Sequence, residues 1–189
     1  MKSRPIDAGR IDYIGHDGKP CSGYFINVAS CGISGLVDHL VNEGSKALGG
    51  KATFFVASLR ATFRYKNALV KVRLDDQPAY EERIYTLAVA NGAYFGGGMN
   101  IAPDAQIDDG TFDVATIGDL SFVEALRLGS LIYKGEQARM SKVATRRARR
   151  IVIEPVDPNE KVLLDVDGET PGRLPATFTL LPGSLLYRG

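Results

Sequence analysis

The sequence predicts a β-rich α+β domain. Apolar stretches typical of strands recur about every ten residues and are separated by Pro, Gly and Asp turns, while helical spacing is confined to about three stretches. Glycine is abundant, at 21 of 189 residues, which favours a backbone that turns tightly and often. A chain of this length can bury a core without disulfide bonds. Because the sequence contains no internal repeat and no long linker, we expect one domain over residues 1–189.

Composition excludes several classes of protein. The 23 Lys and Arg residues nearly balance the 22 Asp and Glu residues, so the chain as a whole lacks the charge of a nucleic-acid-binding polycation. No apolar run approaches the ~18–20 residues of a membrane span, and the N-terminus lacks the apolar region of a secretory signal. Cys21 and Cys31 form no C-x-x-C pair, and His16 and His39 complete no zinc spacing. We therefore expect two buried thiols in a reducing cytoplasm.

The first third of the chain reads as strands followed by two helices. Residues 9–18 predict a strand that ends in an Asp-Gly turn, and the short apolar run 24–29 predicts another strand. Residues 36–41 have the spacing of an amphipathic helix, which leaves His39 on its solvated side. Residues 51–65 are also closest to helical spacing, although their β-branched and aromatic content leaves a strand open.

Apolar runs predict the remaining strands. Residues 69–74 alternate between apolar and cationic side chains, which is the pattern of a half-buried strand. The other predicted strands are residues 84–90, 111–117, 143–156, 162–166 and 176–181.

One helix has a clear start signal. Ser121 and Glu124 form a capping box, in which the serine side chain caps a following amide and the glutamate reaches back. We expect this helix to end near Gly135. The side chains that we expect to be largely buried are those of Phe122, Leu126, Leu128, Leu131 and Ile132.

Two loops rich in glycine or acid are candidate binding sites. The glycine triplet 96–98 is not followed by G-K-[ST], which favours either a structural turn or a backbone that passes close to a ligand. Residues 103–111 hold three carboxylates, those of Asp104, Asp108 and Asp109. Such hard oxygens suit Mg²⁺ or Ca²⁺, although a solvated turn before a strand explains the same composition.

The sequence Asp165-Val166-Asp167-Gly168-Glu169 is the most suggestive cluster. If a strand continues through it, Asp165, Asp167 and Glu169 lie on one side. A carboxylate at a strand end, near another carboxylate, is a natural general base. The alternative is an Asp-Gly hairpin turn with incidental charges.

A basic run lies near the end of the predicted helix. Residues 134–150 contain seven cations and one acid, Glu136. Such a run is either a solvated face or a contact for an anionic partner, such as a lipid surface or a phosphate group. Aromatic side chains are not interleaved as stacking platforms, so we do not expect nucleic acid as a partner.

Taken in order, these motifs resemble the C-terminal domain of the diacylglycerol kinase catalytic-domain family, the bacterial soluble lipid kinases similar to sphingosine kinases. The resemblance covers nearly the whole chain, and its specificity comes from five individually weak motifs in one order. The matching stretches are residues 25–32, residues 89–91 with 96–99, residues 102–105 with 108–113, Gly135-Glu136, and Asp167-Gly168-Glu169 with Pro175 and Phe178.

The resemblance implies a β-sandwich like that of NAD kinase, with about three helices, as the second of two domains. In the family, the first domain carries a Gly-Gly-Asp-Gly-Thr nucleotide loop, and this motif is missing from the sequence. We therefore expect a C-terminal, lipid-substrate domain whose N-terminal nucleotide-binding domain is absent from this chain. Alone, such a domain should not turn over ATP.

The implied function is that of the lipid-substrate half of an ATP-dependent lipid kinase, which phosphorylates a lipid hydroxyl, most naturally that of diacylglycerol. A stand-alone lipid-binding or regulatory module and a relative of NAD kinase are the alternatives. The implied cofactors are ATP, bound mainly by the absent domain, and Mg²⁺, with Ca²⁺ open for a structural site. The implied location is cytoplasmic and peripheral to the inner face of the membrane. Besides the lipid, the membrane surface and the nucleotide domain, a second copy could pair through exposed strand edges.

The resemblance also assigns roles to residues. Asp167 and Glu169 match the family's D-G-E motif, where a carboxylate takes the proton of the lipid hydroxyl. Asp109 matches the side-chain ligand of the structural metal site, with the carbonyls of Gln106 and Thr111 as partners. The glycine-rich turn near the interdomain cleft is matched by Asn91, Gly97 and Gly98.

Overall fold

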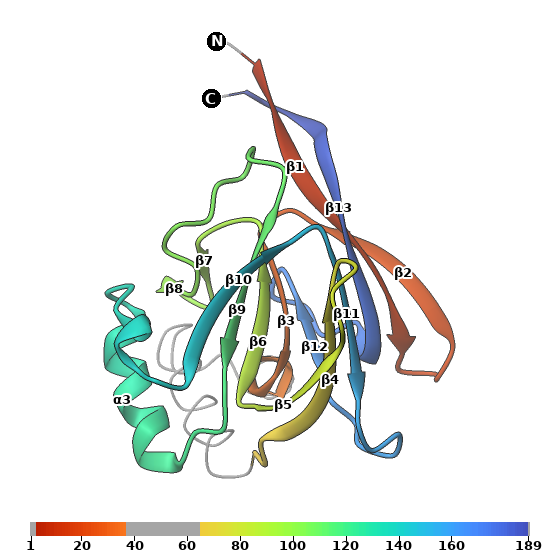
Figure 1. Ribbon diagram of the computed structural model, residues 1–189. Coiled ribbons are helices and arrows are strands. Elements are labelled where there is room, and N and C mark those ends of the chain that lie inside the picture. Colours follow the sequence, from red (N-terminus) through yellow and green to blue (C-terminus); the bar gives the residue numbers. More distant parts are fainter. Residues whose placement is uncertain (1–2, 37–64, 189) are drawn as a thin grey trace, which may run out of the picture.

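The computed structural model describes residues 3–36 and 65–188, and two antiparallel sheets dominate it (Figure 1). The six-stranded sheet runs in the order β2 (Pro20–Phe25), β1 (Ser3–Gly15), β13 (Gly172–Arg188), β11 (Arg150–Pro155), β4 (Ala68–Leu74) and β5 (Tyr80–Ile84). The five-stranded sheet runs in the order β10 (Val143–Ala148), β9 (Phe112–Ile117), β6 (Thr86–Ala90), β3 (Val28–Gly32) and β12 (Leu164–Val166). A small ribbon pairs β7 (Tyr94–Phe95) with β8 (Met99–Asn100).

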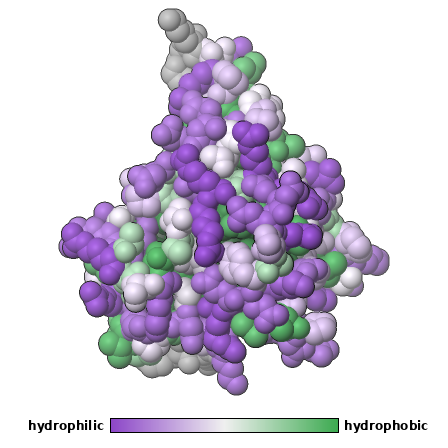
Figure 2. Space-filling view, in the orientation of Figure 1, coloured by the Kyte–Doolittle hydropathy of each residue, from purple (hydrophilic) through white to green (hydrophobic). Residues whose placement is uncertain are grey.

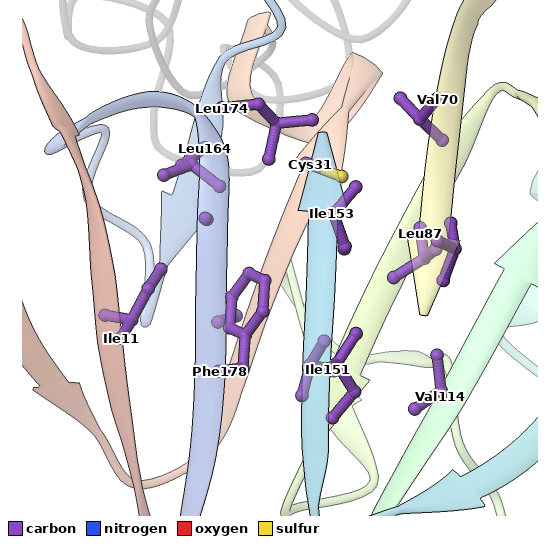
Figure 3. Packing of buried hydrophobic residues seen from close by; sticks show 14 of the residues in the cluster. Ile11, Cys31, Val70, Leu87, Val114, Ile151, Ile153, Leu164, Leu174 and Phe178 are labelled. Carbon is purple, nitrogen blue, oxygen red and sulfur yellow. The ribbon is translucent and has the colours of Figure 1, made fainter. Parts of the chain in front are cut away.

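The sheets pack face to face as a sandwich, as the family resemblance implied. Their inner faces share one hydrophobic core, to which the two sheets contribute side chains such as Phe178 of β13 and Leu87 of β6 (Figure 3). Cys31 of β3 lies in this core as a free thiol, and burial raises its pKa to about 12. Cys21 is also unpaired but only partly buried.

The outer face of the five-stranded sheet forms a second core beneath a helix. This helix, α3 (Phe122–Ile132), begins at the predicted capping box. The Ser121 hydroxyl accepts a hydrogen bond from the backbone N–H of Glu124, and the Glu124 carboxylate accepts one from the N–H of Ser121. A short 3₁₀ helix, η2 (Gln137–Arg139), follows it.

The buried face of α3 differs from the predicted one. Leu128 and Ile132 are buried as expected, and Ala125 joins them. Phe122 and Leu126 instead lie on the exposed side of the helix. Apolar side chains surround so much of this helix that the sequence alone could not identify the face that contacts the sheet.

Three predicted strands are in fact corners. The runs 24–29, 84–90 and 143–156 each divide into two strands, and in each case one strand belongs to the six-stranded sheet and the other to the five-stranded sheet. A chain that bends from one sheet into the other stays apolar throughout, because each of its halves faces the shared core. Apolar composition therefore predicted one strand where the structure has two.

The two helices predicted near 36–41 and 51–65 fall largely outside the described residues. The chain is helical at residues 33–36, where the description of this segment ends. Within the described residues, no helix is both long and apolar enough to cross a bilayer.

Candidate active site

The strand register brings the predicted motifs to one edge of the five-stranded sheet. Val28 pairs with Ala90, and Ala90 pairs with Asp113, so the start of β3, the end of β6 and the start of β9 lie in one row. β12 runs antiparallel to β3 and ends beside its start, where Val166 pairs with Ala29. Because neighbouring strands alternate in direction, the loops that leave this edge come from distant parts of the sequence. They are residues 26–27, 91–100, 106–111 and 167–169.

The D-G-E motif forms a tight hairpin turn. The backbone N–H of Val166 donates to the carbonyl of Glu169 at 2.8 Å, and the N–H of Glu169 donates to the carbonyl of Val166 at 3.0 Å. Between them, Asp167 and Gly168 both have positive φ, at 51° and 90°. This is the conformation for which Asp-Gly is favoured in two-residue hairpins. The strand therefore does not continue, and the expected shared side for the three acids is not formed.

The Asp167 carboxylate anchors the turn to the start of β3. It accepts hydrogen bonds from the backbone N–H groups of Ile26, Asn27 and Val28, at 2.8, 3.1 and 2.9 Å. These three donors belong to the corner between β2 and β3. Asp167 therefore satisfies backbone groups that the strand ladder leaves unpaired at this corner.

Glu169 is placed quite differently. Its side chain is exposed and makes no hydrogen bond or ion pair with any residue that the structure describes. Within the motif, the Asp167 carboxylate is thus bound by the backbone, whereas the Glu169 carboxylate makes no such bond among the described residues.

Asp165 supports the turn from inside the protein. It is buried, accepts a hydrogen bond from the backbone N–H of Gly168 at 2.9 Å, and accepts another from the Ser30 hydroxyl at 3.2 Å. The Ser30 and Ser34 hydroxyl oxygens lie 2.7 Å apart, within hydrogen-bond distance. The third acid of the cluster is therefore part of a buried polar network.

Asn91 is fully buried and connects the same corner to β1. Its amide nitrogen donates to the carbonyl of Ile26 at 2.7 Å and to the carbonyl of Asp7 at 3.1 Å. Its backbone N–H donates to the carbonyl of Asn27 at 2.9 Å, and the Asn27 side chain donates to the carbonyl of Tyr94. Asn91, which the sequence assigned to the cleft, thus holds the residues that Asp167 also binds.

The glycine triplet forms the turn between β7 and β8, and this turn has a backbone conformation that favours glycine. Gly96, Gly97 and Gly98 all have positive φ, at 47°, 77° and 101°. A Cβ at Gly97 or Gly98 would meet no atom within 4 Å. These glycines therefore permit a turn at the surface, and no close backbone approach within the described residues requires them.

Asp7 is a residue of this region that the sequence reading missed. It is buried in β1, and its carboxylate accepts hydrogen bonds from the backbone N–H groups of Gly110 and Gly183, at 2.8 and 2.7 Å. Its own N–H donates to the carbonyl of Ile107. Asp7 thereby joins the acidic loop to β13. The available signal was an acid within the apolar stretch Ile6-Asp7-Ala8.

Asp109 lies in the loop that Asp7 holds. Its Oδ1 accepts a hydrogen bond from the backbone N–H of Thr111 at 3.2 Å, and its Oδ2 lies 3.1 Å from the Arg147 guanidinium. The described residues include no group of three His, Cys, Asp or Glu side chains that could hold a metal ion. The carboxylate and the carbonyls of Gln106 and Thr111 have the oxygen chemistry of a hard cation site. A cation there would compete with Arg147.

Arg147 also faces Asp113 of β9. Its Nε lies 3.4 Å from the Asp113 carboxylate. Burial raises the pKa of Asp113, and the charge and hydrogen bond of Arg147 oppose this rise. Arg147 is therefore the charge partner of two acids at the edge of the sheet.

The rest of the basic run is also largely engaged within the protein. Arg146 lies over the Tyr80 ring, Arg149 donates to the carbonyl of Gly110, and Arg139 pairs with Glu136. Most cations of residues 134–150 thus have a partner within the protein. The sequence could not show this, because most of these partners lie on other strands and loops.

Comparison with known proteins agrees with this architecture. Residues 27–187 match the family model described as the YegS C-terminal NAD kinase beta sandwich-like domain. The chain is 32% identical over 167 residues to a probable lipid kinase YegS-like from Xanthomonas oryzae pv. oryzae (strain MAFF 311018), covering 88% of this chain and 52% of the relative. It is 25% identical over 179 residues to a diacylglycerol kinase of Bacillus subtilis (strain 168), covering 95% of this chain and 55% of the relative.

A solved structure shows the same fold. A crystal structure of a diacylglycerol kinase from Bacillus anthracis str. Sterne superimposes with a TM-score of 0.61 at 20% identity, covering 98% of this chain and 53% of that chain. The present chain spans about half the length of the relatives that it matches. On the match across residues 27–187, the chain belongs to the family of YegS C-terminal NAD kinase β-sandwich-like domains, and its relatives are named lipid kinases and diacylglycerol kinases.

Proposed function

We propose that this chain is the lipid-substrate half of an ATP-dependent lipid kinase that phosphorylates a lipid hydroxyl, with diacylglycerol as the first substrate to test. The observation that carries the proposal is the D-G-E turn. It presents an exposed carboxylate, Glu169, which is unpaired within residues 3–36 and 65–188, on a hairpin that Asp167 fixes by three backbone hydrogen bonds. The names of the relatives supply the class of reaction.

In this proposal the carboxylates of Glu169 and Asp167 have different roles. Glu169 takes the proton of the lipid hydroxyl while the hydroxyl oxygen attacks the γ-phosphorus of ATP and the bond to ADP breaks. Asp167 keeps the turn in place, because its oxygens are occupied by the N–H groups of residues 26–28. Phosphoryl transfer needs little more from the acceptor side than a positioned base, and such a base contributes ~10²–10⁴ in rate.

Nucleotide and metal belong to the proposal as well. The chain lacks a Gly-Gly-Asp-Gly-Thr loop, so ATP would be bound mainly by a nucleotide domain outside this sequence. Asp109, with the carbonyls of Gln106 and Thr111, would hold Mg²⁺ or Ca²⁺ and so order the loop tied to Asp7. Asn91, Gly97 and Gly98 would shape the side of the cleft that faces the lipid. We propose further that the 189-residue chain alone does not turn over ATP.

The test measures phosphatidic acid formed from ATP and dioleoylglycerol in mixed micelles by the protein with a nucleotide domain. Glu169→Gln should lower kcat by ~10²–10⁴ without changing thermal stability. Asp167→Asn should lower both kcat and the melting temperature. Glu81→Gln, at an exposed carboxylate of β5 in the other sheet, is the matched control and should change neither.

Three results would overturn the proposal or a part of it. Full activity of both the Glu169→Gln and Asp167→Asn variants would remove the assigned base. Phosphorylation of NAD and not of any lipid would make the protein a nucleotide kinase. A 189-residue chain that forms phosphatidic acid at the rate of the two-domain protein would refute the need for a separate nucleotide domain.

A further inference from the structure

Among the described residues, helix α3 packs one apolar face against the five-stranded sheet, and a second apolar face is largely exposed. Ala125, Leu128 and Ile132 pack against the five-stranded sheet. The other face is also apolar but remains exposed. Its exposed fractions are 37% for Phe122, 73% for Val123, 52% for Leu126 and 54% for Tyr133. Apolar side chains gathered in this way on a surface mark an interaction site more often than single exposed ones do.

The exposed residues follow one stripe. Phe122, Leu126, Gly129 and Tyr133 are spaced by four, three and four residues, which places them on one line along the helix, with Val123 beside it. A Cβ at Gly129 would meet no atom within 4 Å, so the middle of the stripe is open. Figure 2 shows hydrophobic side chains at the lower left edge of the molecule, where α3 lies in Figure 1.

The charges around the stripe are cationic. Glu124 is paired with Lys142, and Glu136 is paired with Arg139. Arg127 and Lys134 have no side-chain partner among residues 3–36 and 65–188. Arg127 follows Val123 by four residues and so borders the stripe directly. Both acids of residues 122–139, Glu124 and Glu136, are thus paired, and the cations Arg127 and Lys134 carry the remaining charge.

We propose that this surface, the α3 outer face (Val123, Leu126 and Tyr133 with Arg127 and Lys134), docks onto anionic lipid bilayers. Apolar side chains on a helix lying flat insert into the boundary of the acyl chains, and bordering Lys and Arg side chains bind the anionic headgroups. The proposal deepens and rests on the proposed function, because a lipid kinase must reach a substrate held in a bilayer. The leftover positive charge is what favours a lipid surface over a protein partner or a second copy.

Vesicle sedimentation of the protein tests this surface. The vesicles contain phosphatidylcholine alone, or phosphatidylcholine with an equal amount of phosphatidylglycerol. Val123→Glu and Leu126→Glu should each weaken binding to the mixed vesicles by more than about tenfold, because a charge replaces an inserted apolar group. Val156→Glu, at an exposed apolar residue beyond β11, should leave binding unchanged. Val123 contributes nothing to the core, so its variant should keep the melting temperature of the wild type.

Charge variants give a second measurement. Arg127→Gln and Lys134→Gln should each weaken binding to the mixed vesicles about fivefold, and added salt should reduce the difference. Equal binding to the two kinds of vesicle would overturn the proposal. It would also be overturned if Val123→Glu bound as well as wild type, or if wild type bound no vesicles and Leu126→Glu instead dissociated a dimer.

Activity measurements distinguish a failure of the proposed kinase function from a failure of the proposed membrane-binding surface. Leu126→Glu should keep its activity on a short-chain diacylglycerol dispersed in detergent and lose activity on vesicles. Loss of vesicle binding in a protein that never phosphorylates a lipid would support the surface and refute the kinase function. Unchanged activity of Leu126→Glu on vesicles would refute the proposed membrane-binding surface and leave the kinase function standing.

Discussion

Asp167 and Val28 exchange two hydrogen bonds. The N–H of Val28 donates to the Asp167 carboxylate at 2.9 Å, and the N–H of Asp167 donates to the carbonyl of Val28 at 3.0 Å. This reciprocal contact joins positions far apart in the sequence and fixes the D-G-E turn to the first residue of β3. The carboxylate that the sequence selected as a base is therefore also a structural element of the site.

Replacing Asp167 by Asn should destabilise the protein. Asn tolerates the positive φ at this position, so the substitution isolates the loss of the carboxylate. A neutral amide oxygen would then replace the charged acceptor of these N–H groups at an exposed site, which should cost about 0.5–1.5 kcal/mol. Thermal unfolding measures the loss, which corresponds to ~2–4 °C per kcal/mol in a protein of this size. An unchanged melting temperature would show that the three hydrogen bonds do not stabilise the fold.

Two glycine-to-alanine substitutions should act in opposite directions. A Cβ at Gly92 would overlap the side-chain oxygen of Asn27 and push that side chain from its bond to Tyr94, at a cost of about 1–3 kcal/mol. A Cβ at Gly129, inside α3, meets nothing and should stabilise by about 0.5–1 kcal/mol. Urea unfolding of the two variants checks this. A stabilised Gly92→Ala variant would contradict the packing described for Asn27.

Asp7→Ala should loosen the acidic loop. Gly110 and Gly183 would each lose the acceptor of a backbone N–H, at about 1–3 kcal/mol for each group that stays buried without a partner. Hydrogen exchange should accelerate at these two amides more than in β4, which Asp7 does not contact. Uniform acceleration throughout the protein would indicate global destabilisation and not the local role inferred here.

Arg147→Gln should give a pH-dependent loss of stability. The folded-state pKa of Asp113 lies above its ordinary value of 3.8, because burial raises it more than Arg147 lowers it. As pH rises above 3.8, the unfolded state therefore loses this proton first, and Asp113 opposes folding. Without Arg147 the pKa rises further, so the variant should lose about 1–2 kcal/mol at neutral pH, since the arginine is half exposed.

This loss should shrink as the pH falls toward 3.8, because Asp113 then becomes protonated in the folded state of both the variant and the wild type. Urea unfolding at a series of pH values provides the measurement. Arg73→Gln, at an exposed position of β4, serves as the control. A loss that stays constant or grows in acid would contradict the sign of this linkage.

Much of the fold was accessible from the sequence. The alternation of apolar and cationic side chains predicted β4, and the capping box predicted the start of α3. Both signals depend on neighbouring residues alone. The order of weak motifs predicted the family. The corners between sheets were not accessible, because side chains on either side of a corner face the same core and carry the same apolar signature.

The candidate site divides in the same way. The sequence by itself placed the acids Asp167 and Glu169 on either side of a glycine, and its family resemblance predicts that this pair carries the chemistry. Only the tertiary structure decided that Asp167 is bound by the amides of residues 26–28, and that Asp7 ties the acidic loop to β13. It also left the Glu169 side chain exposed and without a hydrogen bond to any residue that the structure describes. The physical reason is that a carboxylate's role depends on which N–H groups and cations surround it, and here those groups come from strands that are distant in sequence and adjacent only in the folded sheets.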